Sequence, residues 1–273
     1  MLTCWEPVSP ATLRRKIMLP LPYCGTPPSP GELLARFNLD PVLITTLVVL
    51  ASAHVYGIPG SNRRGRAYAA SGWLVAALAL VSPLCALSVS LFSARIAQHM
   101  ILVLVAAPLI ALGWPRQSYS VTTWPLWAAS TAFMISLWCW HMPTPYAATF
   151  TSTAVYWTMH VTLFGSSVAL WSELIHHPPR RTALVLSAGL LSSMQMGLLG
   201  AVLALARRPL FYPHFATTQA WGLTALQDQQ LGGTLMWVPG ILLFLWVSIR
   251  SLRRLWNTLE GMSRNESDPA RLS

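Results

Sequence analysis

Long apolar stretches separated by short polar connections dominate the chain from residue 41 onward. A bilayer core about 30 Å thick requires roughly 20 mostly apolar residues per helix. Seven segments approach that length: 41–57, 67–87, 93–113, 121–142, 154–175, 182–206 and 229–252. Prolines in or near these segments are compatible with membrane helices, because neighbouring groups satisfy the freed carbonyls. The pattern therefore predicts an all-α, polytopic bundle of seven transmembrane helices.

Composition supports this class. Of the 273 residues, 54% are apolar and only 10% are charged, compared with roughly 25% charged residues in an ordinary soluble domain. So few charges could not cover the surface of a soluble protein of this size. The four cysteines are also too few for a small disulfide scaffold.

The positive charges predict the orientation of the bundle, because Lys and Arg are enriched in cytoplasmic loops. Eleven basic residues fall on one side of the predicted helices: Arg63, Arg64, Arg66, Arg116, Arg180, Arg181, Arg250, Arg253, Arg254, Arg264 and Arg271. Six fall on the other: Arg14, Arg15, Lys16, Arg36, Arg207 and Arg208. We therefore expect the N-terminus outside and the C-terminus in the cytoplasm.

The ends of the chain differ in character from the apolar region. Residues 1–40 contain many prolines, which predicts a poorly ordered N-terminal segment. Residues 41–256 form the predicted transmembrane domain, and residues 257–273 form a cytoplasmic tail.

Ionisable residues inside membrane helices are costly and are candidates for function. His99, His141 and His160 lie near the outer ends of the third, fourth and fifth predicted helices. Neutral imidazoles suit copper, zinc or haem iron, and nearby thioethers favour reduced copper. The three histidines are therefore the predicted metal ligands, and the candidate supporting residues are Arg95, Gln98, Met100, Met142, Met159 and Asp228.

Structural interpretations of these residues stay open beside the functional one. An intramembrane histidine or Gln98 can donate an interhelical hydrogen bond, and the methionines can fill irregular packing. Asp228 can cap the last predicted helix. Cys85 is interpreted as a buried, unreactive thiol.

Acid–base catalysis has little support in the sequence. Only eight Asp and Glu residues occur, and most lie near the termini. Neither a Ser-His-Asp arrangement nor an HExxH motif is present. We expect a protein that is not an enzyme and has no nucleic-acid partner.

Several stretches resemble the CtaG-type family of seven-helix cytochrome c oxidase assembly proteins. They read LFSARIAQHMILVLVAAPLIALGWP at 91–115, LWCWHMPTPY at 137–146, MHVTLF at 159–164 and WGLTALQDQQLGGTLMWVPG at 221–240. The resemblance covers roughly residues 41–256, and the DQQLGG stretch is its most specific part.

This resemblance implies a role in building a haem–copper oxidase in the bacterial plasma membrane, with copper delivery or insertion as the assisted step. Its expected partners are oxidase subunits, a copper ion or copper chaperone, and the lipid bilayer. Its motif positions carry over to Gln98, His99, His141, His160, Asp228 and Gln229.

One position departs from the family pattern. Family members usually show His-Met-x-Gln-His in the third helix, whereas this chain has Arg95 at the first of those positions. Two histidines four residues apart would share a helix face, but a guanidinium has no lone pair for a metal. Arg95 could instead reach the headgroups, pair with Asp228, or hold an anionic group of a partner.

Three functions follow from these residues. The first is an assembly factor that holds copper transiently near the outer leaflet. The second is a b-type haem or electron-transfer protein with His141 and His160 as axial ligands. The third is a metal-free membrane scaffold for oxidase subunits, which Arg95 favours.

Overall fold

A computed structural model describes residues 21–114 and 123–266, and within those ranges every regular element is a helix. The all-α prediction is confirmed. The principal helices are α2 (Pro41–Gly57), α3 (Arg63–Val81), α4 (Leu84–Ser90), α5 (Phe92–Ile101), η2 (Leu102–Ala106), α6 (Ala107–Gly113), α7 (Trp124–Trp140), α8 (Pro143–Ala148), α9 (Thr153–Ile175), α10 (Thr182–Ala204) and α11 (Ala225–Glu266). Short helical turns occupy Leu33–Ala35 (η1), Pro179–Arg181 (η3), Tyr212–His214 (η4) and Thr218–Trp221 (η5).

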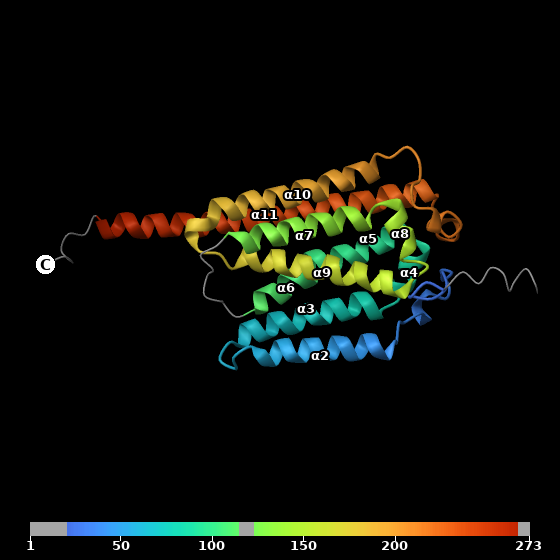
Figure 1. The fold of residues 1–273 in the computed structure, drawn as a ribbon, viewed down its shortest axis with the longest axis horizontal. Helices are drawn as coiled ribbons and strands as arrows, with labels where there is room; N and C mark the ends of the chain where they lie inside the picture. Colours follow the sequence, from blue (N-terminus) through green and yellow to red (C-terminus); the bar gives the residue numbers. More distant parts are fainter. Residues whose placement is uncertain (1–20, 115–122, 267–273) are drawn as a thin grey trace, which may run out of the picture.

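The long helices run side by side along one axis of the molecule (Figure 1). The packing is sequential: α2 lies on α3, α3 on α6, α6 on α9, α9 on α7, α7 on α10, and α10 on α11, which also packs on α5. Short loops and the small helices α4 and α8 gather at one end of the bundle (Figure 1). We call this the α4–α8 end.

Length and hydropathy identify two described segments able to cross a membrane, Phe92–Gly113 and Pro179–Ala204. A third span results if α3 and α4, which meet at a 47° bend, count as one segment. Pro83 occupies the break, where it cannot donate a helical hydrogen bond. Helix α2 is apolar but shorter.

The span from α5 to α6 contains a π-helical turn at η2. Such turns insert one extra residue and often lie near functional sites. Pro108 follows at the start of α6, and the indole Nε1 of Trp171 donates to the carbonyl of Val103 at 2.8 Å. A side chain from α9 thus bonds the irregular backbone directly.

Helices α10 and α11 pack closely at two glycines. A Cβ on Gly200 would lie 2.8 Å from the carbonyl oxygen of Gly233. The two glycines therefore allow backbone to approach backbone, as small residues do between membrane helices. Helix α11 extends well beyond the bundle at the end opposite α4 and α8 (Figure 1). It continues to Glu266, so residues 257–266 of the expected tail are helical.

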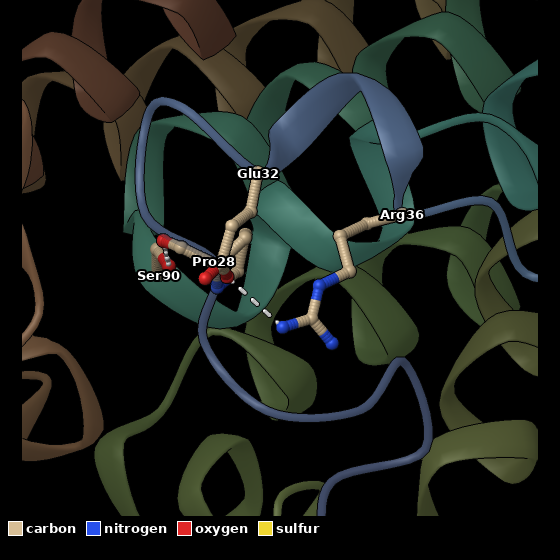
Figure 2. A network of polar contacts seen from close by, with 4 residues as sticks. All are labelled: Pro28, Glu32, Arg36 and Ser90. Carbon is tan, nitrogen blue, oxygen red and sulfur yellow. Dashed lines mark hydrogen bonds and ion pairs between the residues drawn. The ribbon is translucent and has the colours of Figure 1, made fainter.

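Residues 21–40 pack against the α4–α8 end. Cys24 forms a disulfide with Cys85 of α4, so the interpretation of Cys85 as a free, unreactive thiol is wrong. The Tyr23 hydroxyl donates to Asp40 at 2.5 Å, and Asp40 also caps α2. Figure 2 shows the Ser90 hydroxyl donating to the carbonyl of Pro28.

Figure 2 also shows the ion pair between Arg36 and Glu32, at 3.0 Å. The expectation of a poorly ordered N-terminal segment concerns residues 1–40, of which 1–20 lie outside the described residues. In the remainder, the disulfide and the hydrogen bonds of Tyr23 and Asp40 attach the chain to the bundle.

Candidate functional site

Three helices bring the predicted histidines together. His99 comes from α5, His141 from the end of α7 and His160 from the second turn of α9. The ring centroid of His99 lies 5.8 Å from that of His141 and 5.4 Å from that of His160. All three side chains are buried, with at most 4% of their surface exposed. We call these three residues the histidine cluster.

Hydrogen bonds to the helix backbone orient two of the rings. The Nδ1 of His141 lies 2.6 Å from the carbonyl oxygen of Leu137, and that of His160 lies 3.0 Å from the carbonyl oxygen of Tyr156. A carbonyl can only accept, so neutral rings in these positions carry the proton on Nδ1 and a lone pair on Nε2. This arrangement is common behind metal-binding imidazoles.

Four ring nitrogens of the histidine cluster have no hydrogen-bond partner. They are Nε2 of His141, Nε2 of His160 and both ring nitrogens of His99. Buried polar atoms are normally satisfied, so an unpaired group requires a physical explanation. Nitrogen donors of this kind suit copper or zinc.

The present arrangement is not a closed coordination sphere. Among the described residues, no group of three or more His, Cys, Asp or Glu side chains is placed to hold a metal ion. The His99 ring meets the other two edge to face, at interplanar angles of 84° and 76°. The donor chemistry of the three imidazoles nevertheless fits copper.

Arg95 lies one turn before His99 and is 1% exposed. Its Nη1 donates to Thr149 at 2.6 Å, and its guanidinium carbon lies 4.1 Å from the ring centroid of Phe150 and 5.1 Å from that of Tyr146. Such burial excludes the suggestion that Arg95 reaches the headgroups. Aromatic rings from neighbouring elements surround it instead.

Asp228 holds the beginning of α5. Its carboxylate accepts from the backbone of Phe92 at 2.6 Å, from the backbone of Ser93 at 3.1 Å and from the Ser93 hydroxyl at 2.5 Å. The suggestion that Asp228 caps its own helix is wrong, because Thr224 and Gln227 form the reciprocal capping pair of α11. Asp228 instead caps the helix that carries Arg95 and His99.

The other predicted supporting residues have different surroundings. Gln98 donates to the carbonyl of Ala79 at 2.8 Å, which agrees with an interhelical hydrogen bond. Met100 and Met159 are buried, whereas Met142 is 51% exposed and does not share the burial of the histidine cluster.

Two tyrosines were not identified from the sequence. The ring of Tyr156 lies 4.3 Å from that of His160, and its hydroxyl lies 3.3 Å from the sulfur of Cys24. The spacing of Tyr156 and His160 by four residues could have indicated this contact. Tyr146 bonds His214 at 2.6 Å across the loop before α11, which no local pattern signals.

His214 is buried, although it lies in the short turn η4 of the loop between α10 and α11. Burial, with a contribution from the Arg95 cation, lowers the pKa of His214 to about 3. The side chain is therefore neutral in the folded protein at ordinary pH, as its short bond to Tyr146 also allows.

These features define a helical bundle with apolar spans, which indicate association with a membrane, and a buried imidazole cluster near one end. Residues 46–258 match the family described as cytochrome c oxidase caa3 assembly factor, Caa3_CtaG. The chain belongs to this family of oxidase assembly factors, so cytochrome c oxidase is the partner it serves. The family resemblance seen in the sequence is thereby confirmed. No curated protein and no solved structure matches the chain.

Proposed function

We propose that the protein is a seven-span plasma-membrane assembly factor that passes copper to a haem–copper oxidase near the outer leaflet. It binds and releases the ion without catalysing a bond-breaking reaction. Family membership supports the oxidase partner. The number of spans is inferred from the long helical segments of the described residues, which are α2, α3–α4, α5–α6, α7, α9, α10 and α11. The histidine cluster is the observation that carries the copper role.

The orientation rests on two features of the chain. The cytoplasmic end is the one where α3 and α10 begin, because Arg63, Arg64 and Arg181 gather there. The opposite, α4–α8 end carries the Cys24–Cys85 disulfide, which suits an oxidising compartment. The histidine cluster lies toward this extracytoplasmic end.

Ligand exchange is the proposed mechanism. Copper(I) prefers few, soft or borderline ligands, and the unpaired Nε2 atoms of His141 and His160 offer two nitrogen donors beside His99. A site without a complete ligand shell in the resting protein holds the ion weakly enough for transfer. Copper is the cargo in this proposal. The chain orients the imidazole ligands and excludes water from the buried site.

Anaerobic copper(I) titration of the purified protein against a competing chelator tests this proposal. We expect stoichiometric binding, at least tenfold weaker in His99→Ala and His141→Ala. His54→Ala is the matched control, because His54 bonds Trp73 at the opposite end of the bundle. Stoichiometric copper binding that survives both cluster substitutions would exclude the site.

A metal-free scaffold is the second candidate, and buried Arg95 is the observation that favours it. A fixed cation beside the cluster opposes a bound metal ion. This alternative predicts that oxidase assembly in cells survives His99→Ala. Loss of oxidase activity in that variant, restored by added copper, supports delivery instead.

A further inference from the structure

Arg95 is a buried cation without a counter-charge in the described part of the chain. Three carboxylates in this part of the chain accept hydrogen bonds from other groups: Asp228 from α5, Asp40 from Tyr23 and Val42, and Glu32 from Arg36. Two others, Glu173 and Glu260, lie in the distant halves of α9 and α11. Of the three sequence-based suggestions for Arg95, exposure to headgroups and pairing with Asp228 are both excluded. Its charge therefore requires another source of compensation.

The aromatic rings satisfy only part of the guanidinium. Phe150, Tyr146 and Tyr156 lie 4.1, 5.1 and 5.9 Å from its central carbon. Ring faces attract the delocalised charge, but the N–H groups point outward in the guanidinium plane and require acceptors. Nη1 has Thr149 as its acceptor, whereas the buried Nε has none.

A second unpaired donor lies on the same helix face. His99 follows Arg95 by four residues, which places both side chains on one side of α5. Neither ring nitrogen of His99 has a partner, and a neutral imidazole always carries one N–H. The interior of the α4–α8 end thus contains two donors without acceptors beside one uncompensated positive charge.

We propose that Arg95 binds a small monovalent anion of the carboxylate class inside the bundle, between α5, α8 and α9. A single negative charge neutralises the guanidinium, and a planar carboxylate matches the geometry of its N–H edge. The 1% exposure of Arg95 restricts the ligand to a small ion such as formate or acetate. The site stands on Arg95 and its unpaired Nε, and it does not depend on copper binding.

Thermal unfolding of the metal-free protein in detergent, with chelator present and ionic strength constant, tests the site. Formate is titrated in place of the bulky anion gluconate. We expect formate to raise the melting temperature of the wild type saturably. The increase disappears in Arg95→Gln and persists in Arg66→Gln, a matched control because Arg66 also lies over a tyrosine ring, at the other end of the bundle.

Line broadening of 13C-labelled formate in the NMR spectrum provides a direct measurement on the wild type. We expect broadening that unlabelled formate reverses. Arg95→Lys keeps the charge but not the planar edge, and should weaken formate binding at least tenfold. A wild type with neither saturable stabilisation nor broadening overturns the proposal. Equal formate binding by the wild type and Arg95→Gln, or by the wild type and Arg95→Lys, also overturns it.

Discussion

Asp228 fixes the beginning of α5 from the first turn of α11, and its substitution should destabilise the whole α4–α8 end. Three hydrogen bonds converge on its buried carboxylate, from the backbone of Phe92 and from the backbone and hydroxyl of Ser93. Each buried N–H left without an acceptor costs about 1–3 kcal/mol. Asp228→Ala leaves two such N–H groups without an acceptor, so we expect a loss of about 2–6 kcal/mol in the free energy of unfolding.

Three milder substitutions distinguish the contribution of capping to stability from that of general packing. Asp228→Asn should cost about 1–2 kcal/mol, because asparagine also caps helices but loses the charge. Ser93→Ala should cost about 1 kcal/mol for its single hydroxyl bond. Glu32→Gln is the control, since the exposed Arg36–Glu32 pair should contribute less than about 1 kcal/mol.

Denaturant unfolding in detergent, followed by tryptophan fluorescence, measures this series. A double-mutant cycle between Ser93→Ala and Asp228→Ala should give a coupling of about 1 kcal/mol, because each substitution removes the direct bond between the two side chains. If Asp228→Ala is no less stable than Ser93→Ala, the carboxylate does not hold the helix and this reasoning is refuted.

Three further predictions concern other contacts. Cys24→Ser should lower stability by about 4 kcal/mol on the chain-entropy model, for a 61-residue separation from Cys85; thiol labelling of Cys85 and denaturant unfolding measure it, and unchanged stability would refute it. Gly200→Val should force α10 away from the backbone of Gly233 at a cost of about 1–3 kcal/mol; an unchanged unfolding midpoint would contradict this. His214 is neutral when folded but titrates near pH 6.5 when unfolded, so acid favours the unfolded chain. The free energy of unfolding should therefore fall by about 1.4 kcal/mol for each unit that the pH is lowered from 6.5 to 3. Parallel pH profiles for the wild type and His214→Gln would disprove that assignment.

The helices and the proximity of the three histidines could be predicted because each depends on local pattern. Apolar length predicts a spanning helix, and residues at the same depth in adjacent helices can meet. The segments 154–175 and 182–206 therefore match α9 and α10 closely. His99, His141 and His160 came together for the same reason.

Contacts between distant parts of the chain had no such signal. The disulfide joins Cys24 to a residue 61 positions away, and Asp228 bonds residues more than 130 positions away. A carboxylate near a helix start predicts a cap for that helix, but here Thr224 and Gln227 already fill this role. Asp228 was therefore free to cap a different helix.

Arg95 shows how the tertiary surroundings change the meaning of a substitution. In the sequence, an arginine at a histidine position removes a metal ligand and leaves several roles open for its charge. In the fold, Tyr146, Phe150 and Tyr156 come from two further helices and a turn to enclose it. A cation so enclosed beside His99 adds electrostatic repulsion to any metal ion in the cluster. A small anion on Arg95 would reduce that repulsion, so copper(I) affinity should rise with formate in the wild type and be independent of formate in Arg95→Gln.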